Sequence, residues 1–153
     1  MESIGDIVIR AAVADDEAEV RACVEGAYAM YVERIGKPPA PMLADYSALI
    51  DQSAIRVAHD GDALAGLIVM WLEVDHLYVD NIAVHPDVQG QGVGDALLTD
   101  AEEHARGAGR DEIRLYTNTA MMENLTYYPR KGFVETHRAT DDGYDRVYFS
   151  CYL

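Results

Sequence analysis

A strand-like segment that runs into a glycine-rich loop and then a long helix constrains this fold most. Residues 76–84 have the pattern of a strand closed by His85-Pro86, and glycines follow at positions 90, 92 and 94. Residues 92–109 carry apolar side chains at three- and four-residue steps, which predicts an amphipathic helix. A helix start presents unpaired amides, and glycines let a ligand approach the backbone closely. The loop therefore favours a bound phosphate.

Three other interpretations of this glycine loop are possible. A P-loop ends in Gly-Lys-Ser/Thr, whereas Gly94 is followed by Asp95. The dinucleotide fingerprint has glycines spaced GxGxxG within repeated βαβ units, whereas these glycines alternate and antiparallel strands are expected before them. From the loop alone, a tight turn that binds no ligand remains an alternative interpretation.

The rest of the chain predicts strands and helices in mixed order, which indicates an α+β domain with one curved sheet and helices on its faces. The aspartate–glycine pairs at 60–62 and 141–143 predict hairpin turns, and the prolines at 38, 39 and 41 end the first helix. Strands are expected at 7–10, 55–59, 63–74, 112–117, 133–137 and 144–152, and helices at 17–34, 42–50 and 120–128.

Composition narrows the class of protein. The 153 residues suit a single domain, and the formal net charge of −15 disfavours nucleic acid and acidic membrane surfaces as partners. No apolar run approaches the roughly 20 residues that cross a bilayer, and the first ten residues lack a signal-peptide pattern. We therefore expect a soluble, cytoplasmic protein. Cys23 and Cys151 lie far apart and the five histidines are scattered, so neither a metal site nor a disulfide framework is expected.

Residues 89–94, Gln-Gly-Gln-Gly-Val-Gly, closely resemble the Gln/Arg-x-x-Gly-x-Gly/Ala loop of the GNAT superfamily of acyl-CoA-dependent N-acyltransferases. Residues 83–86, Ala-Val-His-Pro, are similar to the end of that family's preceding strand. Residues 123–133 resemble its helix that ends in tyrosine, with Gly-Phe four and five residues further on. The resemblance covers the C-terminal half, and the N-terminal half matches only in its order of elements. It implies a GNAT-like curved, mostly antiparallel sheet of about seven strands flanked by about four helices.

The resemblance implies acetyl-CoA as co-substrate, without a metal. Its pantetheine arm would pair with the backbone of residues 82–84, and its diphosphate would lie on the amides of residues 90–94. The family's helix asparagine is replaced by Met121, and Asn124, one turn later, either substitutes for it or caps the helix. The implied cofactor-binding residues are Ile82, Ala83, Val84, Gln89, Gly90, Gln91, Gly92, Val93, Gly94, Asp95, Asn124 and Tyr128.

The resemblance also implies that Tyr128 is the catalytic acid. A phenol stays protonated at neutral pH and suits a thiolate leaving group. Tyr127 is the alternative acid, and a packed aromatic without a catalytic role is the other interpretation of Tyr128. Pro129 follows directly, and residues before proline avoid helical geometry, so Tyr128 is expected just past the helix.

Asp80 is the expected catalytic base because it is the carboxylate on the cofactor strand. Strand alternation predicts that it shares a face with Tyr78, Ile82 and Val84. Glu73 and Asp75 are the competing carboxylates.

The function expected from these residues is transfer of an acetyl group from acetyl-CoA to a primary amine. Direct attack in a ternary complex is expected, since no cysteine lies by the loop. The alternative is a non-catalytic acyl-CoA-binding module. The acceptor would be a small-molecule or peptide amine; the acidic charge favours polyamines, aminoglycosides or basic peptides, with small amino compounds as rivals. Residues 144–152 are expected as an edge strand that can pair in a homodimer.

Overall fold

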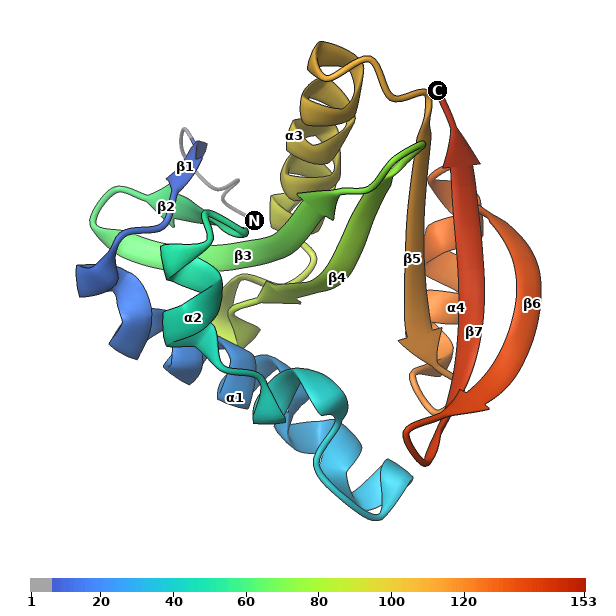
Figure 1. Ribbon diagram of the computed structural model, residues 1–153. Coiled ribbons are helices and arrows are strands. Elements are labelled where there is room, and N and C mark those ends of the chain that lie inside the picture. Colours follow the sequence, from blue (N-terminus) through green and yellow to red (C-terminus); the bar gives the residue numbers. More distant parts are fainter. Residues whose placement is uncertain (1–6) are drawn as a thin grey trace.

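The computed structural model describes residues 7–153, so the first six residues of the expected domain lie outside the described part. Within this range one sheet of seven strands, in the order β1-β2-β3-β4-β5-β7-β6, carries helices on its faces (Figure 1). The strands are β1 (Ile7–Ala11), β2 (Ile55–Asp60), β3 (Ala63–Leu72), β4 (Leu77–Val84), β5 (Glu112–Asn118), β6 (Val134–Asp141) and β7 (Tyr144–Tyr152). The α-helices are α1 (Glu17–Ile35), α2 (Tyr46–Asp51), α3 (Val93–Gly107) and α4 (Met122–Arg130).

The sheet is antiparallel at every strand pair of residues 7–153 except β4–β5, which is parallel. Helices α1 and α2 pack on one face of the sheet, against its N-terminal strands. Helices α3 and α4 lie on the opposite face of the sheet. This mixed α+β arrangement confirms the predicted fold class.

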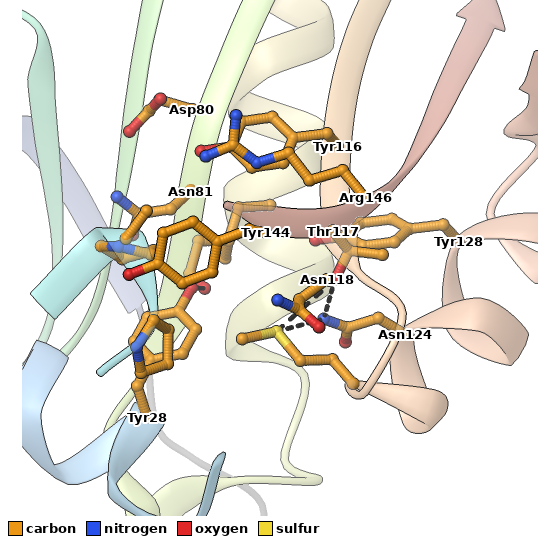
Figure 2. A pocket seen from close by; sticks show the side chains of 15 residues that line it. Tyr28, Asp80, Asn81, Tyr116, Thr117, Asn118, Asn124, Tyr128, Tyr144 and Arg146 are labelled. Carbon is orange, nitrogen blue, oxygen red and sulfur yellow. Dashed lines mark hydrogen bonds between the residues drawn. The ribbon is translucent and has the colours of Figure 1, made fainter. Parts of the chain in front are cut away.

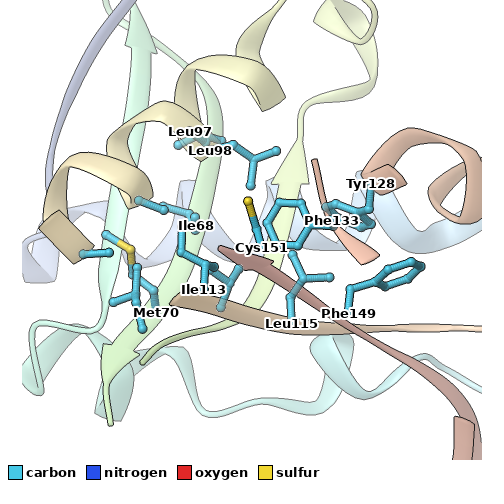
Figure 3. Packing of buried hydrophobic residues seen from close by; sticks show 14 of the residues in the cluster. Ile68, Met70, Leu97, Leu98, Ile113, Leu115, Tyr128, Phe133, Phe149 and Cys151 are labelled. Carbon is cyan, nitrogen blue, oxygen red and sulfur yellow. The ribbon is translucent and has the colours of Figure 1, made fainter. Parts of the chain in front are cut away.

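The larger core lies between the sheet and α3 (Figure 3). Buried residues recur every four positions along α3, at Val93, Leu97, Ala101 and Ala105, and they face the strands. The two alanines let the helix axis approach the sheet closely. Burial of these four side chains places the first turn of α3 against β3 and β4. This contact fixes the position of the glycine loop.

Two predicted elements differ from those observed. The helix expected at 42–50 is a 3-10 turn, Ala40–Leu43, followed by the short α2. The Asp45 side chain accepts a hydrogen bond from the Ala48 amide at 3.1 Å, so this residue caps a new helix and separates the two. The strand predicted to end at residue 137 continues to Asp141.

The expectation that residues 144–152 form an edge strand is wrong. Strand β7 pairs with β5 on one side and with β6 on the other, so its backbone groups are already used within the sheet. The edges of the sheet are β1 and β6.

Candidate active site

The centre of the candidate site is the gap where β4 and β5 diverge. The two parallel strands pair only from Leu77–Ile113 to Val79–Leu115. Beyond Val79, β4 continues to Val84 without a partner on that side, and Figure 1 shows the two strands separating. The sheet therefore presents a free strand edge in its interior.

A β-bulge at Asp80 accompanies the divergence. In the β3–β4 ladder Val69 opposes Asn81 and Met70 opposes Val79, so Asp80 has no partner of its own. The bulge interrupts the alternation of side chains, and Ile82 packs against the same core cluster as Val79. The prediction that Asp80 shares a face with Tyr78, Ile82 and Val84 is therefore wrong for the latter two residues.

The backbone groups of Ile82 and Val84 face the gap. The His85 amide donates to the Ala65 carbonyl of β3 at 2.8 Å, and alternate residues of a strand direct their backbone groups to opposite edges. Two side chains reach these groups from outside the sheet. The Tyr28 hydroxyl donates to the Ile82 carbonyl at 2.9 Å, and the Gln89 amide donates to the Val84 carbonyl at 3.3 Å.

The glycine loop joins this edge to the start of α3. Gly90 and Gly92 have φ values of +79° and +94°, which L side chains rarely adopt, and Gly92 is the residue before the first turn of the helix. A Cβ at either glycine would meet nothing within 4 Å, so the space above the loop is open. The unpaired amides of the first turn therefore face an accessible volume suited to an anion.

Asp95 lies in the first turn of α3 within a small polar cluster. It accepts a hydrogen bond from the Tyr127 hydroxyl at 2.6 Å and forms an ion pair with Lys131 at 3.0 Å. The hydrogen bond from Tyr127, together with the Lys131 charge, holds the pKa of Asp95 below its ordinary value despite partial burial. The cluster ties α3 to α4 beside the loop, and Lys131 partly offsets the negative charge there.

Two cavities meet at the divergence of β4 and β5. A groove of about 540 Å³ runs over the glycine loop between α1, α3 and α4. A smaller cavity of about 40 Å³ lies on the other side, between β4, β5, β7 and residues 39–41 (Figure 2). The residues that line both are Tyr28, Ile82, Asn124 and Tyr128. These four side chains mark the place where molecules bound in the two cavities would touch.

Tyr128 lies inside α4, which continues through Pro129 to Arg130, so the prediction that it lies past the helix is wrong. Its ring packs against Phe133 and Phe149, and this burial outweighs the local preference of a residue before proline. Its hydroxyl takes no part in the side-chain hydrogen bonds of residues 7–153, whereas that of Tyr127 is held by Asp95. Burial raises the pKa of Tyr128 above its ordinary value.

Asn124 lies in the first turn of α4 and lines both cavities. Its side-chain amide donates to the Thr117 hydroxyl of β5 at 3.0 Å. The residue that precedes the helix is Met121, so the alternative interpretation of Asn124 as a helix cap is wrong. Asn124 instead links α4 to the strand that borders the gap.

Asp80 lines the smaller cavity, and the competing carboxylates Glu73 and Asp75 line neither cavity. Glu73 accepts a hydrogen bond from the Trp71 indole at 2.9 Å, and Asp75 bonds the adjacent His76 at 2.7 Å. Burial raises the pKa of Asp80, against the opposing effects of Asn81 and of the Arg146 charge. Of these three carboxylates, Asp80 is the one that lines a cavity at the divergence of β4 and β5.

Several residues of the smaller cavity have no recognised motif in the sequence, above all Tyr116, Asn81 and Arg146. One signal was present: Tyr144, Arg146 and Tyr148 alternate along the last strand and so share one face. Which face that is depends on the strand order β5-β7-β6, which local patterns do not encode.

Neither a metal cluster nor a membrane span emerges from residues 7–153. No group of three or more His, Cys, Asp or Glu side chains in this range is arranged to hold a metal ion. None of the helices in it combines the length and apolar character that a membrane crossing needs. Cys23 and Cys151 are separate buried thiols.

The sequence profile of the acetyltransferase (GNAT) domain matches residues 51–135. The chain therefore belongs to the GNAT family, as its glycine loop predicted.

Aminoalkylphosphonate N-acetyltransferase of Salmonella typhimurium is 30% identical over 89 residues, which make up 54% of this chain and 57% of that protein. The uncharacterized N-acetyltransferase YvbK of Bacillus subtilis is 34% identical over 98 residues, 60% of this chain and 63% of that protein. The match thus spans less than two thirds of either relative. The crystal structure of PaiA N-acetyltransferase from Thermoplasma acidophilum in complex with coenzyme A has the same fold, with a TM-score of 0.80, 17% identity and coverage of 97% of this chain and 100% of that one.

Proposed function

We propose that the chain is one N-acetyltransferase domain, residues 1–153, which transfers the acetyl group of acetyl-CoA to a primary amine in the cytoplasm. The observation that carries the proposal is the meeting of two cavities at Tyr128. One cavity runs along a free strand edge and a glycine loop, and the other contains a carboxylate. A direct transfer between two bound molecules needs this arrangement.

Acetyl-CoA fits the larger groove by its chemistry. Its pantetheine arm carries two amides, which would pair with the backbone groups of Ile82 and Val84 that face the gap. The carbonyls of these two residues accept hydrogen bonds from Tyr28 and Gln89, which the cofactor would replace or share. Its diphosphate would lie on the amides that follow Gly90 and Gly92. The residues proposed to hold it are Ile82, Ala83, Val84, Gln89, Gly90, Gln91, Gly92, Val93, Gly94, Asp95, Asn124 and Tyr128.

Two residues would move protons in the reaction. Asp80 takes a proton from the acceptor ammonium, directly or through water, which leaves a neutral amine. The amine nitrogen forms a bond to the thioester carbon as the carbon–sulfur bond breaks. The Tyr128 hydroxyl donates a proton to the departing thiolate and later regains one from solvent. The nitrogen loses its second proton to solvent as the amide forms, and Asp80 passes the first one to solvent. In the net reaction the ammonium gives up two protons, of which the thiol gains one and the solvent the other. The raised pKa of Tyr128 keeps its hydroxyl protonated beforehand.

The acceptor class is a small-molecule or peptide amine. One relative is named as an aminoalkylphosphonate N-acetyltransferase, and a protein of the same fold is named as a ribosomal-protein-S18-alanine N-acetyltransferase. Both names describe an amine-bearing acceptor. The cavity of about 40 Å³ favours a short amine over the polyamines and aminoglycosides that the net charge suggests.

Release of free thiol from acetyl-CoA against a panel of primary amines tests the proposal. Tyr128→Phe is expected to lower kcat about 100- to 10,000-fold, the usual contribution of a general acid, while acetyl-CoA binding is retained. The matched control is Tyr127→Phe, which removes the neighbouring hydroxyl and leaves the acid in place. Acetyl-CoA binding without turnover on any amine would favour a binding module, and absent binding would refute the assignment of the groove.

A further inference from the structure

The smaller cavity contains a cation that the proposed reaction does not use. Arg146, on β7, lines the cavity, and its side chain is only 11% exposed. Its guanidinium lies over the Tyr116 ring, 4.2 Å from the centroid, and 5.7 Å from the centroid of Tyr144 (Figure 2). A buried charge of this kind is costly unless it is paired.

Arg146 is poorly paired compared with six other arginines of the chain. Its ion pair within residues 7–153 is a contact of 4.0 Å with Asp142, a carboxylate that is 87% exposed. A guanidinium has five N–H donors in a planar fork, and this contact leaves most of them without a carboxylate. Six other arginines contact a carboxylate at 3.0 Å or less, in the pairs Arg10–Asp16, Arg21–Glu17, Arg34–Glu123, Arg56–Asp100, Arg114–Glu112 and Arg138–Glu135.

An unpaired acceptor group and a carboxylate lie in the same cavity. Asn81 is 7% exposed, and its side-chain Oδ1 is buried without a hydrogen-bond partner. Asp80 precedes it on β4, and no ion pair of residues 7–153 joins Asp80 to Arg146. The cavity thus offers two hydrogen-bond acceptors from β4 and one cation from β7.

We propose that the acceptor amine also carries an anionic acid group, a carboxylate or a phosphonate, which Arg146 binds. This inference rests on the proposed acetyltransferase function. Asp80 and Asn81 would receive the amino group, which has two or three N–H donors. The guanidinium would bind two oxygens of the acid group through parallel hydrogen bonds.

The size and charge of the cavity support this class of acceptor. About 40 Å³ holds roughly three water-sized groups, which suits an amine and an acid a few bonds apart. The protein as a whole has a net charge of −15, so its overall field repels an anion. Arg146 supplies a positive charge inside the cavity, where an anionic group can bind despite this overall field. Polycationic acceptors would meet repulsion at Arg146.

The test compares three short amines at saturating acetyl-CoA: β-alanine, 2-aminoethylphosphonate and β-alaninamide, the uncharged amide of the first. The wild-type protein is expected to prefer at least one acid over the amide about 10- to 100-fold in kcat/KM, the usual effect of a charge-assisted pair. The faster of the two acids identifies the anionic group. Arg146→Gln should reduce this preference to about one, and Arg146→Lys should keep part of it. Arg138→Gln, on the exposed strand β6, is the matched control and should keep all of it.

Equal kcat/KM values for the acids and the amide in the wild-type protein would overturn the inference, whether or not the variants fold. A preference that survives Arg146→Gln, in a variant that binds acetyl-CoA with wild-type affinity, would overturn it too. In both cases the proposed acetyl transfer stands. Turnover on no amine at all would instead refute the proposed function, and this inference with it.

Discussion

Gly66 of β3 lies where the sheet, the cofactor strand and the first turn of α3 meet. A Cβ at this position would lie 2.8 Å from the Ala83 carbonyl oxygen and 2.9 Å from a Val93 methyl. The same Cβ would lie 3.3 Å from a methyl group of Leu97. The first of these contacts is with backbone, and Val93 begins the helix, so neither neighbour can move without shifting the groove. Gly66→Ala should therefore disturb both stability and binding.

The expected cost of Gly66→Ala is about 1–3 kcal/mol, the range for one extra methyl group in a packed core. At about 2–4 °C per kcal/mol for a protein of this size, Tm should fall by roughly 2–12 °C. Acetyl-CoA affinity should fall as well, because β4 and the start of α3 must separate slightly. Thermal unfolding and calorimetric titration with acetyl-CoA measure the two effects.

Gly107→Ala is the matched control. Gly107 is the last residue of α3, and a Cβ there would meet nothing within 4 Å. Replacing a helical glycine by alanine should raise stability by up to about 1 kcal/mol and leave binding unchanged. If Gly66→Ala had the Tm and affinity of the wild type, the reasoning from close contact would be refuted. An equal loss in both variants would point to a general effect of helix or strand glycines instead.

Two further predictions concern pH. Burial raises the folded-state pKa of Asp80, so the protein becomes less stable as pH rises from the unfolded-state pKa through the folded-state pKa. Asp80→Asn should therefore raise Tm at pH 7, although it should slow acetyl transfer. An unchanged Tm at pH 7 would contradict this prediction. Arg10 lowers the pKa of Asp16 to about 2, so this pair stabilises the fold above pH about 4 and is lost as pH falls toward 2. Asp16→Ala should lower the free energy of unfolding, measured in urea, by about 1–2 kcal/mol at pH 7; the loss is no larger because Arg10 is partly exposed. This loss should become smaller in acid. If Asp16→Ala lowered the free energy of unfolding by the same amount at pH 7 and pH 2, the stabilising role of the Arg10–Asp16 ion pair would be refuted.

The helices and strands of the fold could be predicted because their signals are local. The four-residue spacing in α3 and the turn at 60–62 involve neighbours in sequence, and the structure has both. The break in the helix expected at 42–50 also has a local cause, the Asp45 cap, which the predicted helix overlooked. The extension of α4 past Tyr128 and the interior place of β7 could not be predicted. Both depend on contacts between distant segments, such as the packing of Tyr128 on Phe149.

The candidate site divides in the same way. The glycine loop and Tyr128 were predicted because their motifs are contiguous in the sequence. Arg146 and Asn81 were not, since one comes from β7 and the other from β4, and only the sheet order brings them to one cavity. The bulge at Asp80 also lacks a sequence signal, because strand alternation predicts a regular β4.

The connection from β4 through α3 to β5 explains why the cofactor groove has a contiguous signature and the acceptor cavity does not. Parallel neighbours require a crossover helix, and such a helix begins at the carboxyl end of the first strand. One unit of 77–118 therefore supplies the free edge of β4, the loop and the helix start together. The smaller cavity combines β4 and β5 of this unit with α1, residues 39–41 and β7, which lie outside it. Under the proposed function, substitutions in residues 39–41 and β7, which line the smaller cavity but not the groove, would change the acceptor without weakening acetyl-CoA binding, as Arg146→Gln tests directly.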